Sequence, residues 1–484
     1  MGGFSESSQP KRIRIARAPR SKSGCRTCRI RHVKCDESPG RCFNCVSTGR
    51  QCDGYDLDRL PPKNGPAGGT TLSVHRMRLV LPDQTSDERR CFSYFQCSTI
   101  PMINVWFDHN MWDRLTLQMS HAEPAICHAV VAVSALQQLV ATTGMPVLPE
   151  DMTNRYHRFA LGQYNRAVSH LISRMNSNDP SVKNMALVCC LLFVVFELTW
   201  GRYDVAILHL QNGVKLLGSQ AQKPLYTSLY HTHPSSALER HIEPSFAAAI
   251  MHLDLQSAHF GVSKLHDGLD LEMFAHRVGH GPSTLDFQTI QDAWIVRDRI
   301  FIQFCMFGNL CESFSAADIC ANYGVLRMEQ RKQQAQLAGF AQALDRFEAA
   351  SIHRRCLTGK ERRALAILRM HHAALSVITD VCLVKCSDTI CSMSMERFNN
   401  VVVQAKSITH SLMEIAPRST PHCPTLLMET GTIAPLFFVI AKCDHPGIQQ
   451  SALVVLESWP HREGLWDSQL AATLARQKMG RSVH

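Results

Sequence analysis

The sequence predicts a mainly α-helical protein: a small N-terminal cysteine-rich cluster with two short helices, a flexible linker and a large all-α domain. Three observations favour this class. Six cysteines repeat at fixed spacing between residues 25 and 52, and prolines and glycines crowd residues 53–83. From residue 86 onward apolar side chains recur with a helical period, and strand signals are sparse. A chain of 484 residues with 45% hydrophobic content is long enough for a large buried core.

Positive charge is concentrated at the start of the chain. Residues 1–60 hold thirteen Lys and Arg against six Asp and Glu, so they carry +7 of the formal net charge of +10. This distribution indicates that nucleic acid is bound near the N-terminus. Residues 1–24 form a basic tail, which we expect to be disordered and to serve nuclear import and phosphate contact.

Membrane association is not expected from the sequence. The N-terminus has no apolar segment of the kind found in signal peptides. The longest apolar run, 185–196, is short for a bilayer span, so we expect a buried core helix there. The chain has twenty cysteines, and most of the fourteen outside the repeat lie in apolar helical context, which favours a reducing compartment.

The cysteine repeat predicts a metal centre. The spacing C-x2-C-x6-C occurs twice, and the two copies contain Cys25, Cys28, Cys35 and then Cys42, Cys45, Cys52. Six thiolates do not fill the eight ligand positions of two separate tetrahedral zinc sites, so two sulfurs must be shared. The repeat nominates the first cysteine of each half, and we expect Cys25 and Cys42 to bridge two Zn²⁺ ions. A disulfide knot and an iron–sulfur cluster are the rival interpretations.

The two halves of this repeat differ in charge. The first encloses the run RIRHVK, whereas the segment between Cys45 and Cys52 has only Arg50. We expect residues 29–34 to form a short helix whose basic side chains face a polyanion. Phosphates attract such side chains without regard to sequence, and contacts to base edges give specificity.

The cysteine spacing and the basic run resemble the zinc binuclear cluster (Zn2Cys6) of fungal transcription regulators. The resemblance implies that Arg31 and His32 contact bases in the major groove, typically of a CGG triplet, and that Arg29 and Lys34 contact phosphate. His32 departs from the family pattern, in which many members have lysine at this position.

Residues 53–83 are predicted to be a linker between the cluster at 25–52 and the helical domain at 86–484. The prolines and glycines of this stretch forbid a regular element. Many members of the family follow the cluster with a coiled coil that sets dimer spacing, but no heptad repeat occurs here. The sequence therefore leaves dimerisation open.

Helices are expected throughout the domain that begins at residue 86. A stripe containing Ile126, Val130, Val133 and Val140 is typical of an amphipathic helix. The stretches FDHNMWDRLTLQMSHAEPAICHAVVAVSAL and SWPHREGLWDS resemble the helical regulatory domain of one group of fungal regulators. The expected helices are 124–140, 151–175, 185–198, 203–217, 238–260, 292–314, 359–386, 396–415, 433–443 and 449–458.

No catalytic signature occurs in the sequence, so we expect a protein that is not an enzyme. The hypothesis is a sequence-specific DNA-binding transcription factor in the nucleus, regulating RNA polymerase II genes and reading CGG-type triplets. Its expected partners are double-stranded DNA and transcription co-regulators. Two alternatives stay open: a helical domain that acts as a small-molecule enzyme, and a zinc-stabilised module that contacts protein or RNA.

Overall fold

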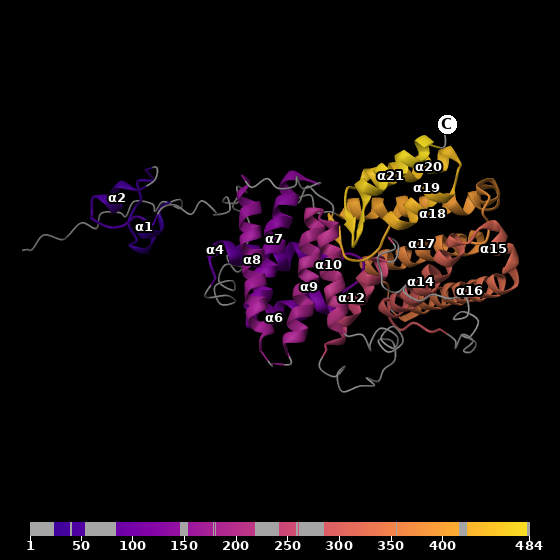
Figure 1. The fold of residues 1–484 in the computed structure, drawn as a ribbon, viewed down its shortest axis with the longest axis horizontal. Coiled ribbons are helices and arrows are strands. Elements are labelled where there is room, and N and C mark those ends of the chain that lie inside the picture. The colour runs from indigo at the N-terminus through magenta and orange to yellow at the C-terminus, as the bar shows by residue number, and fades with distance from the viewer. Residues whose placement is uncertain are drawn as a thin grey trace, which may run out of the picture. The chain divides into compact units, whose positions relative to one another are not determined.

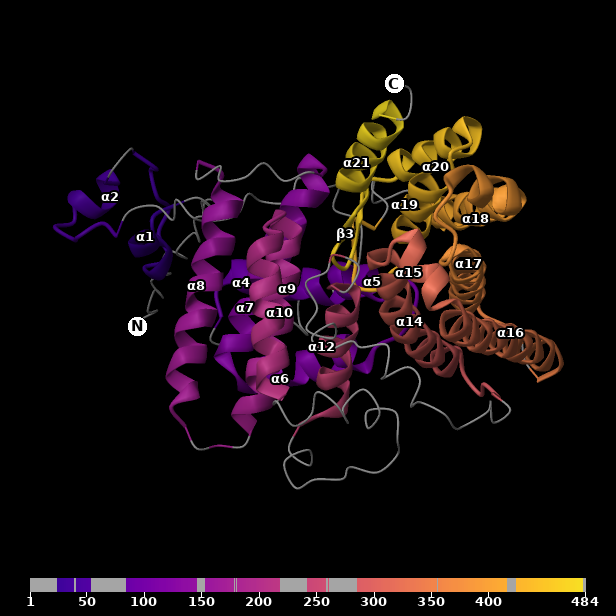
Figure 2. The same ribbon diagram turned by 45° about the vertical axis from the view of Figure 1, so that its right-hand side comes forward.

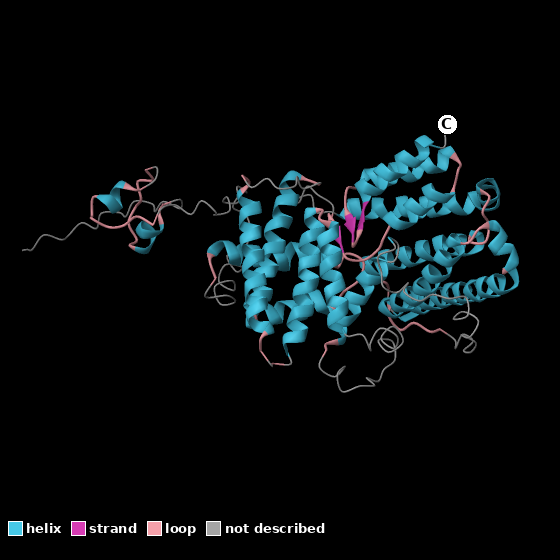
Figure 3. Ribbon diagram, in the orientation of Figure 1, coloured by secondary structure: helices cyan, strands magenta, loops and turns pink. Residues whose placement is uncertain are grey.

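The computed structural model describes residues 24–38, 41–53, 84–145, 153–177, 179, 181–217, 242–257, 260, 285–354, 356–415 and 424–481. The chain divides into two compact units, Met1–Gly65 and Pro66–His484 (Figure 1). The described residues are mainly helical, as the sequence predicted (Figure 3). The predicted tail 1–24 and linker 53–83 lie outside the described residues, except for Gly24 and Asp53.

The first unit holds two short helices, α1 (Arg26–Ile30) and α2 (Phe43–Val46). Each helix begins directly after the first cysteine of a repeat, because that thiol accepts a hydrogen bond from the backbone N–H three residues later. Such a contact satisfies one of the N–H groups that have no partner within the helix. The predicted helix 29–34 was wrong in position, since α1 ends before most of the basic run.

The second unit begins with a group of helices that we call the N-terminal bundle, made of the described residues between 84 and 257. Helix α9 is apolar on all sides and almost wholly buried, and it lies beside α7 and α10 (Figures 1 and 2). Ile126, Val130 and Val133 of the predicted stripe are fully buried in α7. The elements are α4 (Ser86–Tyr94), the π-helical η1 (Phe95–Thr99), α5 (Ile100–Ile103), the π-helical η2 (Met111–Leu115), α6 (Thr116–Ala122), α7 (Pro124–Thr143), α8 (Arg155–Met175), α9 (Ser181–Trp200), α10 (Tyr203–Leu217) and α12 (Pro244–Ser257).

The remaining helices form the C-terminal bundle, made of the described residues between 285 and 481. One continuous apolar core joins α14, α16, α17, α18, α19, α20 and α21. Their bounds, with the short α15, are α14 (Ile290–Ser313), α15 (Ala316–Ala321), α16 (Tyr323–Arg354), α17 (Gly359–Val381), α18 (Ser387–Ile415), α19 (Ile433–Lys442), α20 (Pro446–Ser458) and α21 (Ser468–Arg481).

A small three-stranded sheet lies between the bundles, and the sequence did not predict it. Its strands are β1 (Leu426–Leu427), β2 (Arg462–Glu463) and β3 (Trp466–Asp467); β1 pairs with β2 in parallel, and β2 pairs with β3 antiparallel. Glu463 is fully buried, and its carboxylate accepts N–H groups at the start of α19, from Thr432 at 2.7 Å and Ile433 at 2.9 Å. A carboxylate at this position also interacts favourably with the helix dipole.

Three described helices are long and apolar enough to cross a bilayer by length and composition alone: α7, α9 and α17. The apolar run 185–196 is short for a bilayer span by itself, but it belongs to the 20-residue α9. Inside the bundles, 83%, 89% and 61% of their most apolar windows are buried. Their apolar side chains are therefore covered by neighbouring helices in this structure.

Two buried polar clusters connect the bundles. Arg462 of β2 donates to the Thr199 carbonyl oxygen at 2.9 Å and to the Tyr203 hydroxyl at 3.0 Å. His252 of α12 lies 2.9 Å from an Asp298 oxygen and 2.6 Å from a Glu429 oxygen. Burial alone would lower the pKa of His252, but the two carboxylates outweigh it and raise this pKa to about 10.

Candidate metal centre and nucleic-acid interface

The six cysteines of the repeat converge on one small core. None of the six forms a disulfide; five are buried and Cys52 is half-buried. Their sulfurs form two groups of four in which every sulfur lies within 4.8 Å of the others. Cys25 and Cys42 belong to both groups. Cys28 and Cys35 complete one group, and Cys45 and Cys52 complete the other.

These separations suit zinc. In a tetrahedral site with Zn–S bonds of about 2.3 Å, neighbouring sulfurs lie about 3.8 Å apart. The Cys25 sulfur lies 3.5 Å from that of Cys42 and 3.7 Å from that of Cys45, and the Cys28 sulfur lies 3.6 Å from that of Cys42. A disulfide would require about 2.05 Å, so the sulfur geometry does not fit the disulfide-knot interpretation.

The buried thiols of the cluster require a cation if they are to lose their protons. Burial raises the pKa of Cys25 to about 12, and it raises the pKa of Cys28 and Cys42 as well. Zinc binds the thiolate, so metal binding must displace these protons. Two closed groups of sulfur ligands leave no open position for a substrate, which is typical of structural zinc rather than catalytic zinc.

The backbone around the sulfurs repeats with an offset of 17 residues. The N–H of Cys25 donates to the Cys35 sulfur at 3.4 Å, and the N–H of Cys42 donates to the Cys52 sulfur at 3.4 Å. A residue of the first half therefore has a counterpart of the same structural role in the second half.

Both helices of the cluster end in the same left-handed turn. His32 follows α1 with φ of +58°, and its counterpart Gly49 follows α2 with φ of +65°. The N–H of Val33 donates to the Cys28 carbonyl at 3.1 Å, and the N–H of Arg50 donates to the Cys45 carbonyl at 2.9 Å. This pattern is a Schellman cap, in which glycine is the usual left-handed residue, so the histidine stands at a strained position.

Two aspartates, also counterparts, tie the halves together. The Asp36 carboxylate accepts the N–H groups of Phe43 at 2.9 Å and Asn44 at 3.0 Å, at the start of α2. The Asp53 carboxylate accepts the Thr27 hydroxyl of α1 at 3.0 Å. Hydrogen bonds from Ser38 and from these two N–H groups hold the pKa of Asp36 well below its usual range.

The four predicted DNA-contacting side chains all lie on the first half, at the end of α1 and just beyond it. His32 and Lys34 are exposed, whereas Arg29 and Arg31 are half-buried. Arg31 Nη1 donates to the hydroxyl of its own counterpart, Thr48, at 3.2 Å. This contact was not predicted, because Arg31 and Thr48 belong to different halves of the repeat and are 17 residues apart in the sequence.

The second half presents apolar side chains where the first half presents cations. Phe43 and Val46 are 69% and 55% exposed, and their counterparts are Arg26 and Arg29. Arg26 was not among the predicted site residues. Arg26 is exposed in the first turn of α1. Its place in this helix could have been predicted only if Cys25 had been identified as the helix cap.

Comparison with known proteins finds two domains in this chain. Residues 23–60 match the fungal Zn(2)-Cys(6) binuclear cluster domain, and this domain binds two zinc ions. Residues 90–256 match the fungal specific transcription factor domain. The second match covers the N-terminal bundle from α4 to α12 and does not reach the C-terminal bundle.

The chain is also similar to named fungal regulators. The aspercryptin biosynthesis cluster-specific transcription regulator of Emericella nidulans is 29% identical over 225 residues, 42% of this chain and 35% of that protein. Transcription regulator lscL of Purpureocillium lilacinum is 27% identical over 206 residues, 40% of this chain and 49% of that protein. The transcriptional regulatory protein moc3 of Schizosaccharomyces pombe is 56% identical over 175 residues, 34% of this chain and 30% of that protein. The chain thus spans about half or less of these relatives' length, and no solved structure matches it.

Proposed function

We infer that this chain, with a fungal Zn(2)-Cys(6) binuclear cluster domain followed by a fungal specific transcription factor domain, is a DNA-binding regulator of fungal transcription. We propose that it acts in the nucleus on RNA polymerase II genes and reads CGG-type triplets through the cluster. The observation that carries this proposal is the gathering of cations on one half of a metal-held core, opposite a half whose equivalent positions are uncharged.

The zinc ions have a structural role in this proposal. Cys25 and Cys42 are proposed to bridge both ions, with Cys28 and Cys35 completing one site and Cys45 and Cys52 completing the other. The grouping of the sulfurs into two overlapping sets of four supports this assignment. Because the sites are closed by thiolates, zinc contributes folding energy rather than catalysis, which favours a role other than an enzyme.

We propose different roles for the four basic side chains that were predicted to contact DNA. Lys34 is exposed beyond the helix end, and we propose that it and Arg29 contact phosphate. Arg31 and His32 are proposed to contact base edges. Arginine has five N–H donors, so the Thr48 contact of Arg31 leaves others for the O6 and N7 atoms of guanine.

Fluorescence anisotropy of the zinc-loaded chain with CGG and scrambled duplexes tests this reading. Arg31→Ala is expected to reduce the preference for CGG by about 1–3 kcal/mol, the usual discrimination of a bidentate arginine–guanine contact. Arg50→Ala, the same substitution on the second half, is the matched control and should preserve the preference. An equal effect of both substitutions, or none of either, would contradict the assignment.

The helical unit is proposed to be the regulatory part of the protein, which binds transcription co-regulators.

A competition between duplex DNA and RNA of the same sequence distinguishes a DNA-binding cluster from a module that contacts RNA. We expect the protein to stay bound to a labelled CGG duplex in the presence of excess RNA and to be released from it by excess unlabelled CGG duplex.

A further inference from the structure

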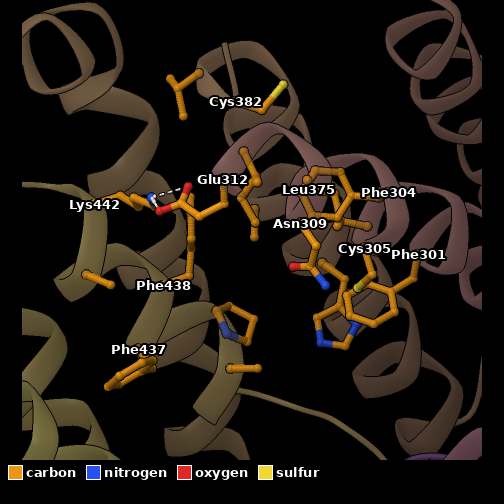
Figure 4. A pocket seen from close by; sticks show the side chains of 18 of the residues that line it. Phe301, Phe304, Cys305, Asn309, Glu312, Leu375, Cys382, Phe437, Phe438 and Lys442 are labelled. Atoms are coloured by element: carbon orange, nitrogen blue, oxygen red, sulfur yellow. Dashed lines mark hydrogen bonds and ion pairs between the residues drawn. The ribbon is translucent and has the colours of Figure 1, made fainter. Parts of the chain in front are cut away.

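The C-terminal bundle contains a cavity of about 510 Å³ (Figure 4). It is bounded by α14, α17 and α19, and Trp466 of β3 closes part of its wall. The cavity lies beyond residues 90–256, so neither matched domain includes it. Its volume is within the range of about 300–1,000 Å³ that is typical of sites for drug-sized ligands.

Helix α19, which forms one wall of the cavity, has two apolar faces. Ile433, Leu436, Val439 and Ile440 are buried in the core. A second stripe, made of Ala434, Phe437, Phe438 and Ala441, is only partly buried and lines the cavity. A helix that is apolar all round is normally covered on every side.

Two phenylalanines, a cysteine and a leucine line the other side of the cavity. Phe301, Phe304 and Cys305 of α14 and Leu375 of α17 gather opposite the α19 stripe (Figure 4). The space is partly open to solvent and its lining is mainly apolar, so an apolar ligand that replaces water there would make more favourable contacts with the lining. A ligand of matching character would supply those contacts.

The charged groups of the wall are already paired within the protein. Arg297 is nine-tenths or more buried, lies 2.9 Å from an Asp298 oxygen, and has its guanidinium 3.6 Å from the centre of the Trp294 ring. Lys442 and Glu312 form an ion pair at 3.2 Å, visible in Figure 4. Because Arg297 is buried beside Asp298, a charged ligand at that end of the cavity would lose its hydration without gaining a new partner for its charge, whereas the Lys442–Glu312 pair is exposed to solvent. A neutral ligand disturbs neither pair.

Two polar side chains of the wall also make hydrogen bonds within the protein. His371 Nε2 lies 2.8 Å from the Gly431 carbonyl oxygen, and Arg297 Nη2 lies 3.4 Å from the Thr430 hydroxyl. The wall thus provides large apolar contact area and few groups that demand a polar partner. This balance selects against a strongly polar occupant.

We propose that this cavity is a binding site for a neutral, largely apolar small molecule with an aromatic or aliphatic skeleton. The proposal stands on the cavity and its lining and does not depend on DNA reading by the cluster. Failure of the CGG experiment would therefore leave it intact, and its own failure would leave the cluster assignment intact.

The test uses the zinc-loaded full chain and N-phenyl-1-naphthylamine, a neutral apolar probe whose fluorescence rises in apolar surroundings. One saturable site per chain is expected. Ala434→Phe fills the cavity from α19 and should weaken probe binding roughly tenfold or more, and because it fills existing space it should not lower the melting temperature. Ala441→Phe, on the same stripe, is the second filling variant in case the first does not fold.

The matched control is Ala249→Phe, the same substitution in the neighbouring 330 Å³ cavity beside α12. It should leave probe binding unchanged. Absence of saturable binding, binding retained in both filling variants, or an equal loss in Ala249→Phe would overturn the proposal.

A further experiment tests whether the cavity prefers a neutral ligand to a charged one. The anionic analogue 8-anilinonaphthalene-1-sulfonate shares the aromatic skeleton but carries a sulfonate, so it is expected to bind roughly tenfold more weakly at this site. If the anion binds as tightly as the neutral probe and Ala434→Phe abolishes its binding, the assignment of a neutral ligand is wrong.

Discussion

The two halves of the cysteine cluster share one backbone and present different surfaces. Each half caps a short helix with a thiol, ends it in a left-handed turn and returns a third cysteine to the core. Around this common frame the first half carries Arg29, Arg31 and Lys34, whereas their counterparts are Val46, Thr48 and Gln51.

The difference separates the source of the fold from the source of recognition. Cysteine spacing decides where the helices begin and how the sulfurs group, because the same spacing gives the same hydrogen bonds twice. The residues between the cysteines decide what the surface attracts. Substitutions at matched positions of the two halves therefore test each role separately.

The largest expected effect is loss of both metals. Cys25→Ala and Cys42→Ala should each remove two zinc ions and unfold the cluster, since metal binding to so small a module contributes on the order of 10 kcal/mol or more. Cys28→Ala and Cys45→Ala should first weaken the ion on their own side. Zinc per chain, measured by plasma mass spectrometry, distinguishes the two classes. Full zinc retention in Cys42→Ala would end the shared-sulfur assignment.

The next effect concerns charge on the surface. Lys34→Ala should weaken binding to CGG and scrambled duplexes alike and flatten the plot of log affinity against log salt by about 0.9, the slope of one phosphate contact. Gln51→Ala, at the counterpart position, should leave that slope unchanged. Anisotropy titrations between low and moderate salt give both slopes, and a selective loss of CGG binding in Lys34→Ala would assign it to bases instead.

A smaller effect is expected at the two aspartates. Asp36 accepts two backbone N–H groups of α2, whereas Asp53 accepts one hydroxyl of α1. Asp36→Ala removes the acceptor of two N–H groups at the start of α2 and should lower resistance to zinc chelation roughly fivefold, while Asp53→Ala should lower it less. Chelator titrations followed by circular dichroism measure both, and the reverse order would show that the second contact matters more.

The smallest effect lies at the left-handed turns. His32→Gly should stabilise the cluster by about 0.5–1 kcal/mol, because glycine adopts positive φ without strain, and Gly49→Ala should destabilise it by a similar amount. Thermal unfolding of the zinc-loaded protein gives both signs. If His32 contacts DNA as proposed, His32→Gly should also reduce discrimination between CGG and scrambled duplexes. Stability that is unchanged in both variants would show that the turn is unstrained.

The sequence predicted the sulfur core well because cysteine spacing is a local, repeated signal. It misplaced α1, since a thiol cap does not belong to the usual Ser, Thr, Asp or Asn signature at helix starts. It also missed α16, the longest described helix, whose many glutamines and charged residues obscure its apolar stripe.

The sheet between the bundles could not be predicted for a different reason. Its strands are two residues long, and β1 and β2 are brought together by contacts between distant parts of the chain. The cavity of the C-terminal bundle is likewise a property of packing, since its wall comes from helices distant in sequence. Periodicity within one segment carries no information about either.

The contact between Arg462 and the Thr199 carbonyl has a consequence for synthesis. These residues are 263 positions apart, so at the usual rate of about 5–20 residues per second the ribosome needs tens of seconds to deliver the second after the first. During this interval the nascent N-terminal bundle lacks β2 and exposes the surface that β2 later covers. The cysteine cluster, whose ligands span 25–52, can bind metal long before. We therefore expect newly made chains to require chaperone protection chiefly at the helical unit, and a stop codon before Arg462 to yield a product with an intact metal centre and an incompletely packed body.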